Sequence, residues 1–97
     1  MKIETTTEVK FPIDKMGYLE LESMYIVLRA YKKYANGEDI EFSGFNDKTG
    51  YVYIALSNGV QIISNFGQEV EFVVTNMHNG DEYFFENYNE ALEYYNA

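Results

Sequence analysis

The second half of this chain is divided by turn signals into short segments of strand-forming residues, and this pattern restricts the fold more than any other feature. Asn58-Gly59 and Asn79-Gly80 are two-residue hairpin signals, because both central positions of a type I′ turn require a positive φ angle. Residues 46–50, with the sequence N-D-K-T-G, are typical of a longer hairpin loop. The segments between these turns predict strands at residues 40–45, 51–57, 60–66, 69–77 and 82–86.

Two helices and one further strand are predicted around this region. Residues 2–11 alternate between apolar or Thr side chains and charged ones, which predicts a half-buried strand. Between residues 19 and 36, apolar residues recur at three- and four-residue spacing and predict a long helix, for which Gly37 suits the left-handed stop. Its predicted buried stripe consists of Met24, Val27, Leu28, Tyr31 and Ala35. Asn87, with Glu90 three residues later, fits a capping box and predicts a short C-terminal helix.

These elements predict an α+β fold in which an antiparallel β-meander of five to six strands packs on the longer helix, with the short helix at the C-terminal end. With 97 residues, of which 46% are hydrophobic, the chain forms one domain over residues 1–97 and can bury a core. The absence of Cys excludes disulfides and thiolate sites. Residues 1–7 lack the apolar region of a signal peptide, and the longest apolar run, 51–56, is too short to cross a bilayer. We therefore expect a cytoplasmic protein.

Hairpin geometry predicts a sheet face with carboxylates around an apolar centre. If Asn79-Gly80 is a two-residue turn, Thr75 pairs with Phe84, and paired residues project to the same side of the sheet. The predicted core face then carries Val70, Phe72, Val74, Tyr83 and Phe85. The opposite face carries Glu71, Val73, Thr75, Met77, Glu82, Phe84 and Glu86. Charged rims around apolar centres are typical of interfaces, whereas the alternative is a solvated face with scattered apolar residues.

The Asn58-Gly59 hairpin is predicted to be apolar on both faces. One predicted face carries Val52, Ile54, Leu56 and Ile63, and the other carries Tyr51, Tyr53, Ala55, Val60, Ile62 and Phe66. A sheet that packs on one helix needs only one apolar face. The tyrosine-rich face must then be covered by the C-terminal helix, by a second copy in a homodimer through Tyr51 and Tyr53, or by a partner.

Charge is distributed very unevenly along the chain. The formal net charge is −9, and all seven Lys and Arg residues lie within the first 48 positions. In residues 49–97 all the charged residues are acidic, namely Glu69, Glu71, Asp81, Glu82, Glu86, Glu90 and Glu93. Such a field repels nucleic acid and anionic membranes and attracts basic surfaces, including those that normally hold nucleic acid. The residues predicted to bind a partner are Glu71, Val73, Glu82, Phe84, Glu86, Glu90 and Glu93.

Signals for catalysis are weak, and we predict a protein that is not an enzyme and needs no cofactor or metal. His78 is the sole histidine; with Asp81 it could orient a base, but the chain has no G-x-S-x-G elbow. The spacing of an EF-hand calcium loop and the phosphate-binding fingerprints are also absent. The basic cluster of Arg29, Lys32 and Lys33 is explained by the dipole of the predicted long helix. Direct binding of nucleic acid is therefore not expected.

In overall character the chain resembles the small acidic inhibitors encoded by phages and mobile elements, such as anti-CRISPR proteins and other nucleic-acid mimics. The shared features are single-domain length, the net charge of −9, the absence of Cys and the second half without bases. The resemblance implies a stoichiometric blocker that occupies the basic nucleic-acid channel of a bacterial host protein, with carboxylates placed where phosphates would lie. The alternative is a non-enzymatic intracellular interaction or subunit domain whose acidity serves solubility.

Overall fold

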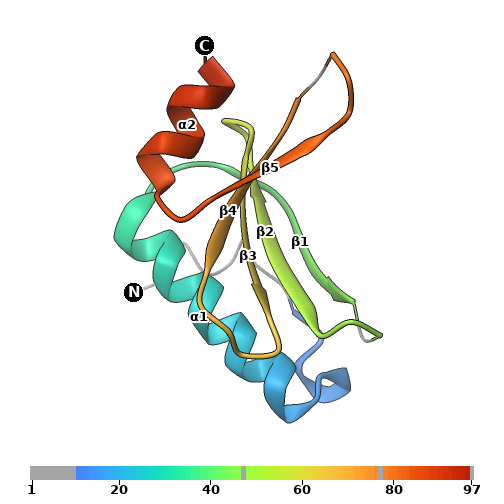
Figure 1. Cartoon of the computed structure of the whole chain (residues 1–97). Coiled ribbons are helices and arrows are strands. Elements are labelled where there is room, and N and C mark those ends of the chain that lie inside the picture. Colours follow the sequence, from blue (N-terminus) through green and yellow to red (C-terminus); the bar gives the residue numbers. More distant parts are fainter. Residues whose placement is uncertain (1–10, 47, 77, 97) are drawn as a thin grey trace.

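A computed structural model describes residues 11–46, 48–76 and 78–96, and these form the predicted α+β fold (Figure 1). Five strands make one antiparallel sheet in the order β1-β2-β3-β4-β5. The strands are β1 (Ile40–Asn46), β2 (Tyr51–Leu56), β3 (Val60–Asn65), β4 (Glu71–Thr75) and β5 (Glu82–Phe85). The helices are α1 (Tyr18–Tyr34) and α2 (Tyr88–Asn96), and a short 3-10 turn, Ile13–Lys15, precedes α1. Residues 2–10 of the first predicted strand lie outside the described residues.

Helix α1 forms where the apolar periodicity predicts it. Its first turn is closed by a hydrogen bond of 2.7 Å from the Gly17 N–H to the Glu20 carboxylate, and Gly37 has the predicted left-handed conformation, with φ +94°. Four residues of the predicted stripe are buried, and Leu28 is half-buried against the same core. The four are Met24, Val27, Tyr31 and Ala35.

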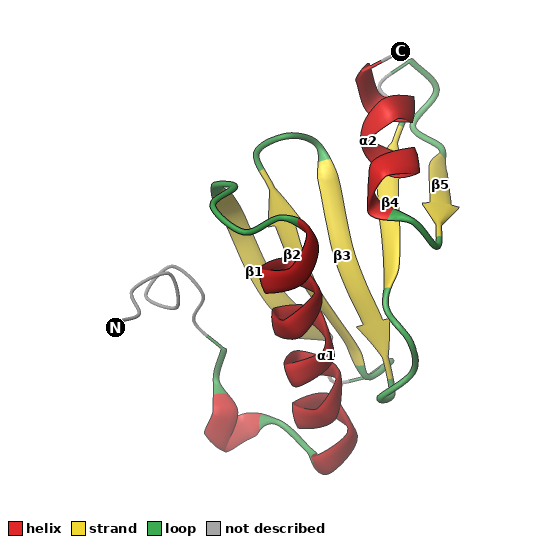
Figure 2. Ribbon diagram, turned by 90° about the vertical axis from the view of Figure 1, so that its left-hand side faces the viewer, coloured by secondary structure: helices red, strands yellow, loops and turns green. Residues whose placement is uncertain are grey.

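Both helices lie on the same face of the sheet. Figure 2 shows α1 in front of β2 and β3 and α2 in front of β4. The core between these layers includes Ile54, Ile62 and Phe72 from the strands. Helix α2 contributes Tyr88 and Ala91, and the Tyr88 ring meets the Phe72 ring edge to face at 5.7 Å. The C-terminal helix therefore widens the cover of the core face and leaves the tyrosine-rich face uncovered.

The predicted cap of α2 is confirmed. The Asn87 side-chain oxygen accepts a hydrogen bond of 3.1 Å from the Glu90 N–H, which satisfies one of the free donors at the helix start. The Tyr94 ring of this helix packs against Tyr83 and Phe85 of β5, with ring centroids 5.0 and 5.7 Å apart. These contacts anchor α2 on the edge strand.

The predicted register between β2 and β3 is wrong by one residue, and this reverses the faces of β3. The loop has three residues, 57–59, because Gly59 is left-handed and donates its N–H to the Leu56 carbonyl, while the Val60 N–H bonds the Asn58 side chain. Ile54 therefore pairs with Ile62, and Tyr53 pairs with Ile63. A shift of one residue exchanges the two faces of a strand. Val60 and Ile62 lie in the core, and Ile63 joins the tyrosine-rich face.

The predicted register between β4 and β5 is wrong by two residues. Thr75 pairs with Glu82 instead of Phe84, because the connection is longer than a two-residue turn. The side-chain oxygen of Asn76 accepts hydrogen bonds from the N–H groups of His78 and Asn79, and the Asn76 carbonyl accepts one from the Gly80 N–H. An even shift preserves the alternation of side chains. The predicted division of faces therefore holds for the paired residues of β4 and β5, with Val74 opposite Tyr83 and Val73 opposite Phe84, while Met77 lies outside the described residues.

The turn after β3 is held to α1 by buried hydroxyl groups. Phe66 has φ +50° and Gly67 has φ +74°, and the Gln68 N–H closes the turn on the Asn65 carbonyl. The Ser23 hydroxyl oxygen of α1 accepts a hydrogen bond of 2.6 Å from the Gly67 N–H. The Ser64 hydroxyl donates to the Gln68 carbonyl at 2.6 Å and lies 3.2 Å from the Ser23 hydroxyl. Because a non-glycine residue at positive φ costs free energy, these bonds help to hold the turn.

A candidate protein-binding face

The sheet face opposite the helices, here called the open face, is covered by neither α1 nor α2, the helices of the described residues. It is turned to the right-hand side of Figure 1. From β1 and β2 it carries Phe42, Gly44, Asn46, Tyr51, Tyr53 and Ala55. From β3, β4 and β5 it carries Gln61, Ile63, Asn65, Glu71, Val73, Thr75, Glu82 and Phe84. The described residues of this face include no Lys or Arg, so its charged groups are all acidic.

One row of paired residues crosses the open face through all five strands and shows which part of that face is exposed to solvent. The row runs Phe42, Ala55, Gln61, Val73, Phe84. The two outer rings are 55% and 54% exposed, whereas Val73 is 1% exposed although no helix lies over it. The exposed side chains of this row are thus at its two ends, and its middle is buried or half-buried. We call Ala55, Gln61, Ile63 and Val73 the apolar centre of the open face, with Phe42 and Phe84 as its outer rings.

An aromatic cluster borders the apolar centre of the open face on the β1 and β2 side. The Tyr53 ring lies over Gly44 of β1, where a Cβ atom would come within 2.8 Å of the Tyr53 hydroxyl oxygen. The same ring meets Phe42 edge to face at 6.1 Å and Tyr51 at 5.7 Å between centroids. The missing side chain of Gly44 therefore gives the Tyr53 ring its place. The cluster combines apolar rings with hydroxyl groups, a combination that is frequent at interfaces.

Carboxylates border the open face on the β4 and β5 side. Glu71 lies opposite Ile63, Glu82 lies opposite Thr75, and Glu86 directly follows β5. We call these three exposed residues the acidic margin. Glu71 and Glu86 also line a hollow of about 310 Å³, together with Gln68, Glu69 and Val70. This arrangement concentrates negative charge beside the apolar centre of the open face.

The ionisation of Tyr51 depends on its surroundings on the open face. The pKa of Tyr51 is raised above the ordinary tyrosine value of 10.0, first by burial, then by the negative charge of the Glu82 carboxylate and by Tyr53. Both neighbours oppose the formation of a tyrosinate anion. The sequence treats the carboxylate face and the tyrosine-rich face as two surfaces, whereas the structure joins them into one.

Five of the seven predicted partner-binding residues lie together, and two lie elsewhere. Val73 and Phe84 face each other across β4 and β5, and the acidic margin stands beside them. Val73 is buried, so it forms part of the apolar centre rather than an exposed contact. Glu90 and Glu93 are on α2, which packs on the other face of the sheet. The sequence pattern does not connect Phe42, Ala55 or Gln61 with this site, because the register that joins them depends on the length of the β2–β3 loop.

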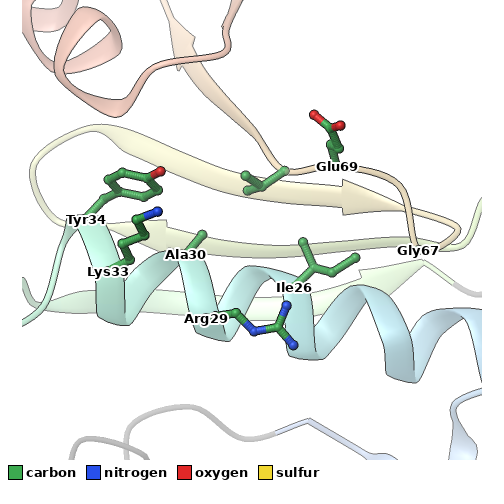
Figure 3. Close-up of a pocket in the computed structure, with 8 residues that line it drawn as sticks. Ile26, Arg29, Ala30, Lys33, Tyr34, Gly67 and Glu69 are labelled. Carbon is green, nitrogen blue, oxygen red and sulfur yellow. The ribbon is translucent and has the colours of Figure 1, made fainter.

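A second, more basic hollow of about 330 Å³ lies between α1 and the segment before β4 (Figure 3). Ile26 and Ala30 form its apolar side on the helix, and Val70 faces them from the segment before β4. Arg29 and Lys33 project from α1 at its border, and the Lys33 amino group lies 5.2 Å from the centre of the Tyr34 ring. This hollow is outside the open face and contains none of the predicted site residues.

Features of catalysis do not gather at either hollow. His78 is exposed, and its backbone N–H bonds the Asn76 side chain. Across the described ranges, no three His, Asp or Glu side chains are grouped so as to hold a metal ion. Neither α1 nor α2, the helices within residues 11–96, combines the length and apolar character that a membrane crossing needs. Comparisons of the chain with protein-family profiles, curated proteins and solved structures gave no match.

Proposed function

We propose that this chain is a small acidic protein-binding inhibitor that uses the open face to occupy a basic, nucleic-acid-binding surface of a partner in the cytoplasm of a bacterial host. One observation carries the proposal: exposed aromatic rings around an apolar centre and a margin of carboxylates share a sheet face whose described residues include no base. A face that served solubility alone would not need exposed Phe42 and Phe84 beside its carboxylates.

In the proposed complex, charge and apolar contact have separate roles. Carboxylates of Glu71, Glu82 and Glu86 pair with Arg and Lys side chains that would otherwise hold phosphates, and they speed association with basic surfaces. The rings of Phe42 and Phe84 are buried against the partner and slow dissociation. Mimicry of nucleic acid then consists of negative charge at the margin, with affinity supplied by the exposed rings of Phe42 and Phe84.

The basic residues of α1 do not cancel this field at the open face. Arg29 and Lys33 belong to the helix layer on the other side of the sheet. Packed layers are about 10 Å apart, and charges are screened over about 8 Å at physiological ionic strength. The two sides of the molecule can therefore present opposite local potentials.

The second candidate function is a non-enzymatic interaction or subunit domain, and the exposed rings of Phe42 and Phe84 favour it, since apolar rings suit a subunit contact without any need for charge. A homodimer through Tyr51 and Tyr53 is one form of it. Such a domain would bind its partner with weak dependence on salt and would leave the partner's nucleic acid in place. Salt dependence and displacement therefore distinguish the two functions.

The test begins with capture of basic proteins from a bacterial lysate on the tagged chain at low salt. The captured protein is purified and loaded with labelled DNA or RNA, and the chain is then titrated into the complex at several salt concentrations. We expect displacement of the nucleic acid at about one chain per partner, weakening steeply as salt rises. A captured protein that binds the chain and keeps its nucleic acid would contradict the inhibitor and favour the interaction domain.

Charge-matched variants show whether the acidic margin is responsible. The double variant Glu82→Lys/Glu86→Lys changes the open face, and Glu90→Lys/Glu93→Lys makes the same change in net charge on α2. We expect the first variant to lose displacement and most of its salt dependence, and the second to retain both. An equal loss in the two variants would mean that overall charge, not this face, drives binding.

A further inference from the structure

We propose that the hollow between α1 and the segment before β4 binds a small organic acid in its anionic form, with a compact apolar body. Arg29 and Lys33 bind the anionic group, and the apolar body lies between the helix and Val70. This inference goes beyond the proposed function and does not depend on it, because the hollow belongs to the helix layer and lies outside the open face.

The apolar side of the hollow is accessible to a ligand. Ile26 on α1 and Val70 before β4 are only half-buried, so each exposes part of its side chain. In Figure 3 the side chains of Ile26 and Ala30 are directed from the helix toward the segment before β4. The volume of about 330 Å³ is at the lower end of the range for ligand cavities. A compact ligand therefore fits this hollow better than a dinucleotide does.

Two cations on successive turns of α1 border the hollow. Arg29 and Lys33 are four residues apart, so they are neighbours on the helix surface, where like charges repel each other. Neither forms an ion pair with a described residue, although Glu69 borders the same hollow. An anion bound between them relieves this repulsion and accepts charge-assisted hydrogen bonds from both side chains.

Aromatic contacts hold Lys33 at one end of the hollow. Its amino group lies 5.2 Å from the centre of the Tyr34 ring, a distance typical of a cation–π contact. The Tyr34 ring in turn meets the buried Phe72 ring edge to face, with 5.7 Å between the centroids. Because these contacts restrict Lys33 before a ligand arrives, less side-chain freedom is lost on binding.

Glu69 restricts how much negative charge the ligand can carry. Its carboxylate is exposed, and Figure 3 shows it directed away from α1. A negative group on this side of the hollow would be repelled by Glu69, whereas one on the α1 side meets Arg29 and Lys33. The site therefore selects a monoanion whose apolar end faces the segment before β4, and it disfavours a polyanion such as nucleic acid.

NMR titration of the full chain tests this site, with phenylbutyrate as the probe and its uncharged amide as the control ligand. We expect saturable shifts of the methyl signals of Ile26, Ala30 and Val70, and about tenfold tighter binding of phenylbutyrate than of the amide. Lys33→Gln should weaken the binding of phenylbutyrate about fivefold. Lys32→Gln makes the same change in net charge at an exposed neighbour that does not line the hollow, and should leave the affinity within about twofold.

Glu69→Gln should have the opposite sign, because it removes a repelling carboxylate, and tighten the binding of phenylbutyrate about twofold. Equal affinities for phenylbutyrate and its amide would overturn the inference. So would equal losses for Lys33→Gln and Lys32→Gln, shifts confined to residues outside the hollow, or the absence of saturable shifts. Displacement of nucleic acid tests the open face alone, so the failure of this inference and the failure of the proposed function are distinguishable.

Discussion

The two faces of this sheet bury similar side chains by different means. On the covered face, Ile62 lies beneath α1 and is completely inaccessible to solvent. On the open face, its neighbour Ile63 is 2% exposed, although neither α1 nor α2, the helices of the described residues, packs on that face. The comparison shows that a side chain can be buried on either face of this sheet. The covered face is distinguished by the helices that pack over its buried residues.

The neighbouring pair Ile62 and Ile63 gives the largest expected difference between the two faces. Removal of a core side chain leaves a cavity that a packed helix cannot fill, whereas the rings around Ile63 can move inwards. We expect Ile62→Ala to lower the free energy of unfolding by about 4 kcal/mol and Ile63→Ala by about 2 kcal/mol. Urea denaturation followed by circular dichroism measures both. Equal losses would mean that the open face is packed as rigidly as the core.

The polar contact beneath α1 gives the next effect. Ser23→Ala leaves the half-buried Gly67 N–H without its acceptor, so we expect a loss of about 1 kcal/mol in the free energy of unfolding. Thr75→Val removes a hydroxyl from the open face, where solvent can replace it, and should change stability by less than about 0.5 kcal/mol. Similar losses in the two variants would show that the hydroxyls of Ser23 and Thr75 have equivalent surroundings.

The smallest expected effect concerns the ionisation of Tyr51. Since its pKa is raised in the folded chain, the unfolded chain loses this proton first as the pH rises. Its contribution to stability is complete below pH 10.0 and is lost as the pH rises through the folded pKa. Tyr88, whose pKa burial also raises, adds a loss of the same sign from the covered face.

A charge variant connects this titration with the joined surface. Glu82→Gln removes a negative neighbour and should lower the pKa of Tyr51, measured from the NMR signal of its ring. Glu90→Gln, on the other side of the sheet, should leave that pKa unchanged. A Tyr51 pKa that is indifferent to Glu82 would separate the acidic margin from the tyrosine cluster.

The fold could be predicted from the sequence because its turns and helix caps are determined by residues that are close together in the chain. Gly37, Asn87 and the apolar spacing of α1 each act within a few residues, and the structure agrees with them. Register was less accessible. The loop at Asn58-Gly59 can have two or three residues. Its length depends on the hydrogen-bond partners of the Asn58 side chain and of the Gly59 N–H group, and these bonds form only once the strands have paired.

The candidate site shows the consequence of this difference. The sequence pattern places Glu71, Val73, Glu82 and Phe84 on one face correctly, because the register error between β4 and β5 is an even number of residues. It places Ile63 on the wrong face, because the register error between β2 and β3 is odd. Because of this one-residue register error, the sequence also does not show that the tyrosine cluster and the acidic margin share one surface. Alternation along a strand is local information, whereas the joining of strands into a face is not.

The central claim is that the open face binds the partner, and two exposed aromatic residues test it most directly. Phe84 on the open face is 54% exposed and Tyr25 on α1 is 59% exposed, so Ala at either position should leave the fold intact. Calorimetry with the captured partner should show at least a tenfold loss of affinity for Phe84→Ala, or about 1.4 kcal/mol, and less than a twofold change for Tyr25→Ala. Unchanged affinity for Phe84→Ala, or an equal loss for Tyr25→Ala, would contradict the claim.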